Sequence, residues 1–188
     1  MSTELLSIRH LTTDDGVTVD SVFAGLSEQS RYLRFHAPMP RLSGSVRRSL
    51  LALDGHDRTA LVAEVPGPSG PLPVGIARLG RTGRTQGEIA IAVIDEWHGL
   101  GIGRRLLTDL AELAGRSGYT LLHAYVLPEN RQVLRLLESV FPGATRHWDG
   151  WVLQVDCPVN PEMNPRRQPR DSAATSPRPT VSASTRTH

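Results

Sequence analysis

Residues 88–107 read EIAIAVIDEWHGLGIGRRLL, and this stretch decides the fold. Its first eight residues, EIAIAVID, are mostly small or β-branched and apolar, which predicts a strand. The residues after the turn, 101–118, place leucines on one side of a helix and predict an amphipathic α-helix. Gly99, Gly101 and Gly103 form the turn, so unpaired N–H groups point outward where the helix begins. A strand-to-helix turn of this kind is an anion-binding site.

Strand and helix patterns alternate along the rest of the chain. Strand patterns fall at 5–9, 59–65, 74–80 and 119–127, with a Pro/Gly turn over 66–73 and a closing hairpin over 144–155. Helical patterns run from capping residues at 12–15 to about Leu26, from the cap Ser27 to the prolines at 38 and 40, and over 45–53 and 128–140. This alternation predicts a single α/β domain.

The composition changes near the end of the chain. From Cys157 onward the sequence has five arginines, six prolines and few apolar residues. Such a segment cannot bury enough surface to offset its ordering entropy, so we expect a folded domain over 1–156 and a disordered basic tail over 157–188. Residues 1–156 contain sixteen arginines and seventeen acidic residues. A near-neutral body indicates no nucleic-acid partner.

Composition also removes several function classes. The chain has one cysteine, and none of its 21 basic residues is a lysine. An intrachain disulfide, a cysteine-based zinc cluster, a phosphate-binding loop with Gly-Lys and a lysine Schiff base are therefore excluded. The histidines lack metal-ligand spacing, so we expect no metal site. With no signal-peptide pattern and no apolar run of ~18 residues, we expect a cytoplasmic protein that does not enter the membrane.

At the glycine turn the sequence resembles the GNAT superfamily of N-acetyltransferases. The signature of that superfamily is Gln/Arg-x-x-Gly-x-Gly/Ala, and residues 98–103 read HGLGIG, with His98 in the first position. The strand before the turn, the strand LLHAYVL after the helix, Asn130 and the terminal hairpin extend the resemblance over about residues 5–155. The resemblance implies one GNAT-like domain with a central mixed, mostly antiparallel sheet flanked by helices.

The resemblance also implies acetyl-CoA as co-substrate, bound by three groups of residues. Main-chain N–H groups at the helix start would hold the pyrophosphate, helped by two arginines. The strand end would pair with the pantetheine, and an asparagine at the start of the next helix would contact the cofactor. The first group is Leu100, Gly101, Ile102, Gly103, Arg104 and Arg105, the second is Val93, Ile94 and Asp95, and the third is Asn130.

Direct acetyl transfer needs a neutral amine, so a base has to accept a proton from the acceptor. Glu88 begins the strand before the glycine turn and resembles the glutamate that protein-acetylating members place there. We expect its neighbours Ile89 and Ile91 to desolvate its carboxylate and make it a stronger base. The weaker candidates for this base are Asp95, Glu96 and Glu129.

The general acid is not assigned by the sequence. Many family members use a tyrosine seven residues after the asparagine, and here Leu137 stands at that position. Tyr125, water or no acid at all stay open, because a thiolate with a pKa of ~8.5 is a tolerable leaving group.

Together these residues predict an N-acetyltransferase that moves an acetyl group from acetyl-CoA to an amine by direct transfer in a ternary complex. The acceptor is a protein lysine or a small-molecule amine, and segment 27–40 is similar to the acceptor side of bacterial protein-lysine acetyltransferases. The alternative is a non-catalytic acyl-CoA-binding sensor or partner module, consistent with His98 and Leu137 departing from the family pattern. A homodimer is left open.

Overall fold

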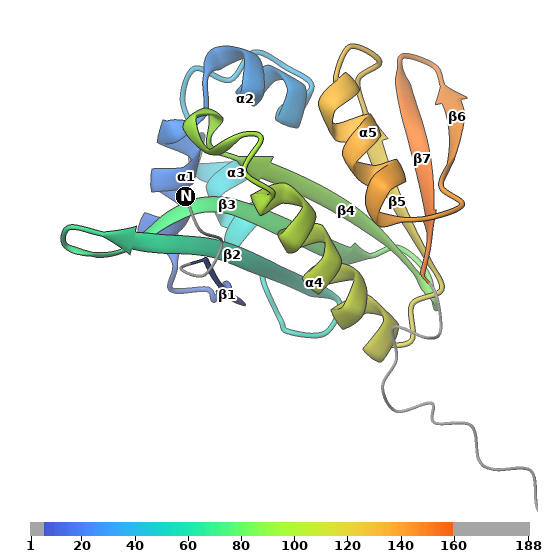
Figure 1. Cartoon of the computed structure of the whole chain (residues 1–188), viewed down its shortest axis with the longest axis horizontal. Helices are drawn as coiled ribbons and strands as arrows, with labels where there is room; N and C mark the ends of the chain where they lie inside the picture. Colours follow the sequence, from blue (N-terminus) through green and yellow to red (C-terminus); the bar gives the residue numbers. More distant parts are fainter. Residues whose placement is uncertain (1–5, 160–188) are drawn as a thin grey trace, which may run out of the picture.

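The computed structural model describes residues 6–159, which form one α/β domain around a seven-stranded sheet (Figure 1). The strands are β1 (Ser7–His10), β2 (Arg58–Gly67), β3 (Gly70–Arg81), β4 (Gln86–Val93), β5 (Leu121–Val126), β6 (Thr145–Asp149) and β7 (Val152–Pro158). The α-helices are α1 (Gly16–Gly25), α2 (Glu28–Phe35), α3 (Gly44–Leu51), α4 (Ile102–Arg116) and α5 (Arg131–Val140), and a short 3-10 helix, η2 (Asp95–Trp97), precedes α4. Within residues 6–159, no helix combines the length and the apolar character that crossing a bilayer requires.

The order of the strands across the sheet is β1-β2-β3-β4-β5-β7-β6. All neighbouring strands run antiparallel except β4 and β5, which confirms the predicted mixed, mostly antiparallel sheet. β4 and β5 pair only where Gln86–Glu88 lies beside Leu121–His123. Beyond these residues the two strands diverge (Figure 1), and the sheet opens toward the start of α4.

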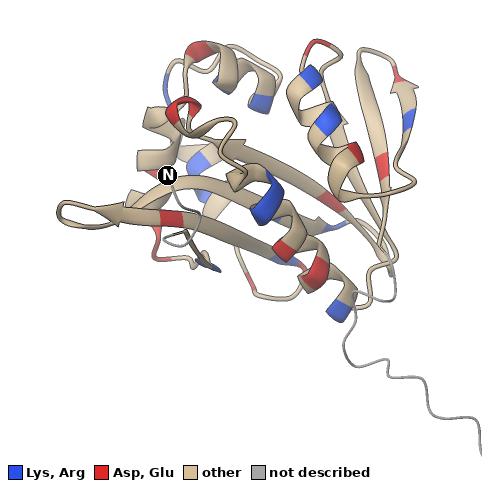
Figure 2. Ribbon diagram, in the orientation of Figure 1, with Lys and Arg blue, Asp and Glu red and all other residues tan. Residues whose placement is uncertain are grey.

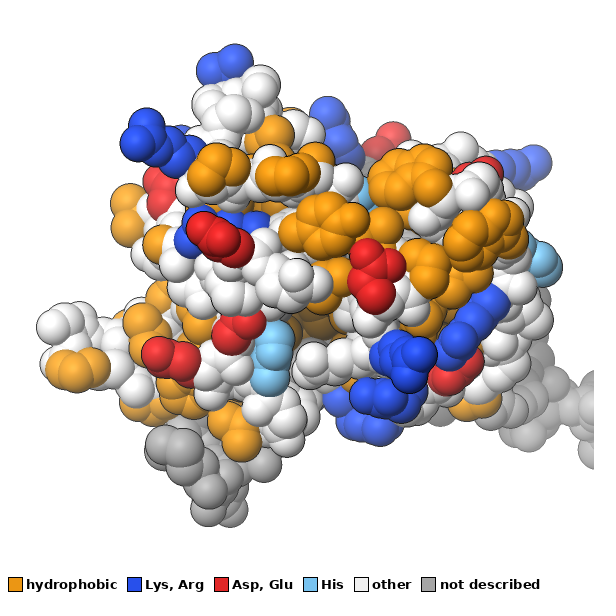
Figure 3. Space-filling view, turned by 90° about the horizontal axis from the view of Figure 1, so that it is seen from above, with side chains coloured by type: hydrophobic (Ala, Val, Ile, Leu, Met, Phe, Trp, Pro, Cys, Tyr) orange, Lys and Arg blue, Asp and Glu red, His pale blue; other side chains and the backbone are white. Residues whose placement is uncertain are grey.

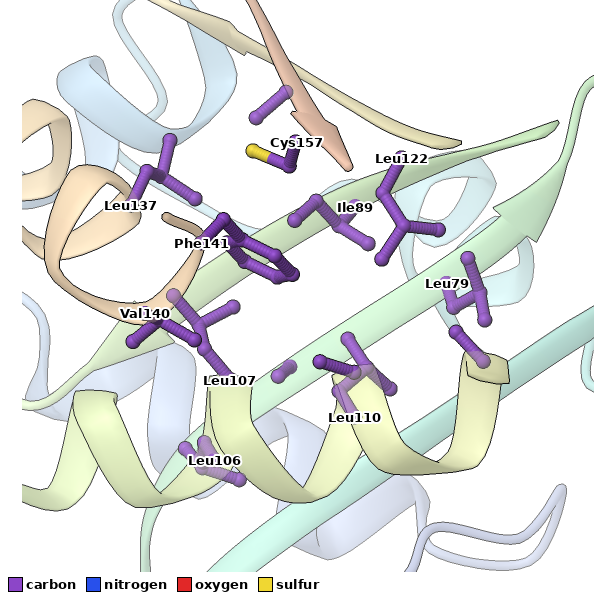
Figure 4. Close-up of a cluster of buried hydrophobic side chains, with 14 of the residues drawn as sticks. Leu79, Ile89, Leu106, Leu107, Leu110, Leu122, Leu137, Val140, Phe141 and Cys157 are labelled. Carbon is purple, nitrogen blue, oxygen red and sulfur yellow. The ribbon is translucent and has the colours of Figure 1, made fainter. Parts of the chain in front are cut away.

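Helices cover both faces of the sheet, because alternate residues of a strand point to opposite sides. On one side Leu106 and Leu110 of α4 pack with Phe141 in the main core, which Figure 4 shows in close-up. On β2, Ala63 belongs to this core, whereas its neighbour Val62 belongs to a second cluster with residues of α1 and α3. The sheet is therefore the middle of three layers.

Most predicted elements form where the sequence places them. Ser27 is the N-cap of α2, and its hydroxyl accepts a hydrogen bond from the Ser30 N–H at 3.1 Å. The segment 66–73, expected as a turn, instead continues β2 and β3, which pair as far as Gly67 and Gly70. Because the strands pair to the tip of the hairpin, main-chain N–H and C=O groups of this segment bond to each other, whereas in a wider loop they would bond to water.

The fold continues past Asp156, where the sequence placed the end of the domain. The Val159 N–H donates to the Thr120 carbonyl at 3.0 Å, and Val159 is 6% exposed. Cys157 is fully buried in the main core (Figure 4). The folded part therefore extends at least to Val159, because two apolar residues at the end of β7 complete the core. The expectation of a disordered tail for 160–188 lies outside the described residues.

Truncation after Asp156 should destabilise the domain, whereas truncation after Val159 should not. The shorter protein loses the buried side chains of Cys157 and Val159, which we expect to cost about 3 kcal/mol. For a domain of this size that is a fall of roughly 6–12 °C in melting temperature. Thermal unfolding followed by circular dichroism compares both truncations with the full chain. Equal melting temperatures for the two truncations would contradict a folded part that reaches Val159.

Candidate active site

A cleft of about 830 Å³ opens where β4 and β5 diverge. Besides these strands, its walls come from the start of α4, from α5, from the second half of α2 and from the turn between β6 and β7. Figure 3 looks onto the end of the molecule that carries α2 and the β6–β7 turn, and hydrophobic side chains gather there. The cleft therefore joins segments that lie far apart in the sequence, within residues 26–36, 88–107 and 124–152.

Seven of the predicted site residues line this cleft and four do not. Those that line it are Glu88, Val93, Gly101, Ile102, Gly103, Arg104 and Asn130. Those that lie outside it are Ile94, Asp95, Leu100 and Arg105. The structure thus brings the two ends of β4, the start of α4 and the start of α5 to one site.

The turn before α4 is shaped to bind an anion. Gly99 and Gly101 have φ angles of 76° and 81°, a left-handed conformation that residues with a side chain rarely adopt. The first main-chain hydrogen bond of the helix runs from the Arg105 N–H to the Gly101 carbonyl at 3.0 Å. Within the described residues, no backbone carbonyl accepts from the three preceding N–H groups, those of residues 102–104. These donors and the helix dipole together favour negative charge.

Arg105 and Leu100 contribute less to this end of the cleft than the sequence predicts. The Arg105 N–H is used inside the helix, and its guanidinium donates to Asp109 at 2.9 Å. Leu100 is 48% exposed. Arg104 lines the cleft, and it also donates to the Ser139 carbonyl of α5 at 3.2 Å. Figure 2 shows the basic first turn of α4 in blue, and within it Arg104 brings positive charge to the cleft.

The edge of β4 that faces the cleft presents main-chain groups of Val93 and Ile91 rather than those of Ile94. The Ile94 N–H donates to the Val74 carbonyl of β3 at 2.9 Å. In an antiparallel ladder this directs the main-chain groups of Val93 and Ile91 to the opposite edge, from which β5 has diverged. His98, which stands where the signature has Gln or Arg, places its Nε2 2.8 Å from the Val93 carbonyl oxygen. The edge open to strand pairing therefore comprises Ile91 and the Val93 N–H.

Asp95 anchors α2 instead of lining the cleft. Its carboxylate accepts hydrogen bonds from the Ser27 N–H at 2.9 Å, the Ser27 hydroxyl at 2.7 Å and the Ser30 hydroxyl at 2.8 Å. Burial alone would raise the pKa of Asp95, but these hydrogen bonds outweigh burial and hold the pKa below its ordinary value. Because Ser27 is the N-cap of α2, Asp95 ties the end of β4 to a helix that forms one wall of the cleft.

Asp95→Asn should lower the stability of the domain at neutral pH by about 1–2 kcal/mol, since it weakens charged hydrogen bonds in a partly solvated place. A depressed pKa in the fold means that Asp95 stabilises above its unfolded pKa of about 3.9 and loses this effect as the pH falls through the lower, folded value. Urea unfolding at about pH 7 and about pH 3 measures the difference, with the exposed carboxylate variant Asp14→Asn as control. If Asp95→Asn lowers the free energy of unfolding as much at about pH 3 as at about pH 7, this role of Asp95 is contradicted.

Glu88 lies on β4 where the paired part of β4 and β5 ends. It stands opposite Gly80 of β3 and His123 of β5, and its exposed side chain lines the cleft. The desolvation expected from Ile89 and Ile91 is wrong, because strand alternation turns both residues to the α4 side of the sheet, where Ile89 is part of the core.

Charged groups, rather than isoleucines, lie near Glu88. Burial lowers the pKa of both Arg34 in α2 and Arg78 in β3, and the negative charge of Glu88 opposes that effect at each. The other candidate bases, Asp95, Glu96 and Glu129, do not line the cleft. Among the described residues, the carboxylates that line it are Glu88 and Asp149, the latter at the turn between β6 and β7.

The structure also places three residues that the sequence singled out: Leu137 at the position of the missing acid, Tyr125 as its candidate replacement and Asn130 as a cofactor contact. Leu137, at the position of the missing tyrosine, is buried in the main core. Tyr125 on β5 is 39% exposed and lines the cleft. Asn130 lines the cleft and is the N-cap of α5, with its Oδ1 accepting the Val133 N–H at 3.2 Å. α5 therefore begins after Asn130, later than the predicted start at residue 128.

Among the cleft residues that the sequence did not predict, three carry a charged or aromatic side chain from distant elements. Arg34 and His36 come from the end of α2, and Trp151 comes from the β6–β7 turn. The His36 and Trp151 rings meet edge to face, with their centroids 5.5 Å apart. In the sequence, Arg34 and His36 stand next to the apolar residues of a short predicted helix, and nothing there marks them as site residues. No local pattern relates them to Trp151, because tertiary folding alone brings α2 and the hairpin together.

Outside the cleft, His123, Gln154 and Asp156 form a polar group. His123 on β5 has its Nδ1 2.8 Å from an Asp156 carboxylate oxygen, and Gln154 donates to the same oxygen at 2.8 Å. Within residues 6–159, no group of three or more His, Cys, Asp or Glu side chains is arranged to hold a metal ion.

Comparison with known proteins assigns the family. The model of the acetyltransferase (GNAT) family matches residues 21–141, which is more than half of the chain. The chain therefore belongs to the GNAT acetyltransferase family.

Solved structures share the fold over most of the chain. The GNAT domain of S. lividans PAT aligns with a TM-score of 0.73 at 27% identity, covering 80% of this chain and 89% of that chain. A GCN5-related N-acetyltransferase from Kribbella flavida aligns with a TM-score of 0.64 at 22% identity, covering 84% and 99%. The protein yncA from Salmonella typhimurium, solved with its cofactor acetyl-CoA, aligns with a TM-score of 0.57 at 20% identity, covering 84% and 94%.

Proposed function

We propose that this chain is an N-acetyltransferase that moves an acetyl group from acetyl-CoA to an amine by direct transfer in a ternary complex. The observation that carries the proposal is a single cleft with an anion-binding helix start at one end and Glu88 at the other. Glu88 and Val93 lie five residue steps apart on β4, which is about 17 Å at the rise of a strand. An extended donor held at α4 can therefore present its far end to Glu88.

The start of α4 fits the pyrophosphate of acetyl-CoA. The N–H groups of residues 102–104 would bind its oxygens, and Arg104 would add positive charge. A Cβ placed on Gly103 would stand 3.0 Å from Leu136 Cδ2 and 3.8 Å from Val93 Cγ2. Glycine at 103 thus keeps a passage between α4, α5 and β4 open to a ligand.

The strand edge and α5 would hold the rest of the co-substrate. The main-chain groups of Ile91 and the Val93 N–H would pair with the pantetheine amides as a further strand would. Asn130 lies on the opposite wall, where its amide can reach a ligand while its Oδ1 caps α5.

Glu88 would act as the base of the reaction. Bound acetyl-CoA supplies a thioester whose carbonyl carbon bonds to the amine nitrogen while its C–S bond breaks and the electron pair leaves on sulfur. Glu88 would accept the proton that the acceptor ammonium has to lose, directly or through one water. The Tyr125 hydroxyl or water would return a proton to the sulfur, although a thiolate of pKa ~8.5 can also leave unprotonated.

An amine screen tests the proposal. The purified chain is incubated with acetyl-CoA and a panel of lysine peptides, amino acids and other small amines, and free thiol release is measured against a no-acceptor background. Calorimetry measures acetyl-CoA binding in parallel. We expect binding and acceptor-dependent thiol release, with the acceptor a protein lysine or a small-molecule amine. Binding without such release would favour the non-catalytic sensor, and absence of binding would overturn both functions.

A further inference from the structure

Arg34 is a charged side chain of the cleft that has no hydrogen-bonding or ionic partner among the described residues. It lies in the last turn of α2 and lines the cleft near Glu88. Within residues 6–159, no hydrogen bond or ion pair engages its guanidinium, whose Cζ lies 5.0 Å from the centroid of the Phe35 ring. Arg31, one turn earlier, donates to the carbonyls of Phe23, Ala24 and Pro40 and shows what a structural arginine of this helix does.

The surroundings of Arg34 are apolar and positive. Burial, followed by the charge of Arg78, lowers the pKa of Arg34 to about 10, so the group stays protonated at neutral pH. The Nε of Arg78 is buried and has no hydrogen-bond partner among the described residues. Glu88 is near enough to oppose these effects but forms no ion pair with either arginine. Arg34 is only partly exposed to water. A partly desolvated charge without a partner is unfavourable, and an anion in the cleft would compensate for the lost hydration.

We propose that Arg34 binds a carboxylate of the acceptor, so that the substrate is an amino acid whose amine reaches Glu88. The inference rests on the proposed function and names the substrate class of the same site. A guanidinium offers two parallel N–H donors to a carboxylate, which fixes the orientation of the ligand as well as its charge. Arg34 and Glu88 are of opposite charge and line one cleft, as the two ends of an amino acid require.

The apolar and aromatic side chains that share the cleft with Arg34 predict the character of the amino acid. Leu33, Phe35, Tyr125 and Trp151 line the same cleft. Together they offer an apolar and aromatic surface to the acceptor side chain. L-phenylalanine is therefore the first probe. L-phenylalaninamide, which keeps the amine and the ring but lacks the negative charge, is its matched control.

The first arm of the test compares amino acids with their amides. Thiol release from acetyl-CoA is measured for L-phenylalanine, for the other natural amino acids and for the corresponding amides. We expect kcat/KM for the best amino acid to exceed that of its amide by about 10–100-fold. Lysine peptides with aspartate or asparagine beside the lysine form a second arm, which shows whether an acidic protein side chain supplies the carboxylate. If no amino acid is favoured over its amide, the proposal is wrong, and a preference found only among the peptides would assign the carboxylate to a protein acceptor instead.

The third arm uses Arg34→Met, with Arg34→Lys as the conservative variant and Arg41→Met, at an exposed arginine, as control. Arg34→Met should lose the preference for the carboxylate through KM, retain its turnover of the amide and keep its acetyl-CoA affinity. Arg34→Lys should restore part of the preference. A loss that is equal for the amino acid and the amide would show a structural role and overturn the proposal. Circular dichroism checks that each variant is folded.

Binding separates this inference from the proposed function. Calorimetry measures L-phenylalanine binding to the CoA-saturated protein without any turnover. The chain could bind L-phenylalanine, lose this binding in Arg34→Met and yet acetylate no amine. That result would support the carboxylate site and rule out the acetyltransferase function. If the chain acetylates amines but does not distinguish amino acids from their amides, the acetyltransferase function stands and the carboxylate site at Arg34 is wrong.

Discussion

Glu88→Gln should lower turnover by about 10²–10⁴-fold on any accepted amine, because the variant keeps the shape of the side chain but cannot accept a proton. Acetyl-CoA affinity should stay within about twofold, since Glu88 lies five residue steps of β4 away from Val93 and the helix start. The limb of the rate–pH profile that belongs to the base should disappear as well. Initial rates across pH and calorimetric titration of acetyl-CoA measure the three effects.

Glu129→Gln is the matched control for this experiment. Glu129 is an exposed acid just before α5, it does not line the cleft, and the sequence named it as another candidate base. Its replacement should leave the rate and the pH profile unchanged. Nearly full turnover in Glu88→Gln would move the base to solvent or to Asp149, the other carboxylate that lines the cleft, and would leave the acetyltransferase function standing.

Gly103→Glu should weaken acetyl-CoA binding by at least about 100-fold, because it places bulk and negative charge at the N–H groups that would hold the pyrophosphate. The Cβ alone would meet Leu136 Cδ2 at 3.0 Å, which is the end of a flexible side chain and can yield. The folded domain should therefore survive the substitution. Titration calorimetry gives the affinity, and thermal unfolding confirms the fold.

Two variants separate the causes of that loss. Gly103→Ala adds only the Cβ and should weaken binding by much less than Gly103→Glu. Ser117→Glu adds the same charge at the exposed far end of α4 and should leave acetyl-CoA affinity unchanged. Unchanged affinity in a folded Gly103→Glu protein would mean that the pyrophosphate is held elsewhere.

Local patterns in the sequence predicted the parts of the cleft that a single turn or strand builds. The glycines before α4 require left-handed dihedral angles, and helix geometry leaves the N–H groups of residues 102–104 free wherever such a helix lies. Asn130 caps α5 by the same local chemistry. These features depend on residues within four positions of one another, so they can be predicted from the sequence.

Errors arose where a neighbouring strand or helix decides the outcome. Pairing with β3 uses the Ile94 N–H, and the N-cap of α2 uses the Asp95 carboxylate, so neither residue faces the cleft. The error at Ile89 could have been avoided from the sequence, because successive side chains of a strand point to opposite faces and Ile89 therefore points away from Glu88. The sequence placed the end of the domain at Asp156, because the two buried side chains that follow, Cys157 and Val159, give too weak a pattern to separate them from a polar segment.

The sequence by itself determined the class of fold and the glycine turn before α4, because hydrophobic periodicity and the dihedral needs of glycine act over a few residues. The family was indicated by the resemblance of residues 98–103 and their flanks to the GNAT signature. Only the tertiary structure decided where β4 and β5 diverge and which side chains meet in the gap. Arg34, Glu88 and Trp151 lie on three separate elements, and no spacing along the chain relates them. Their proximity results from the packing of α2 and the last hairpin around the open edge of β4, which is a property of the whole domain.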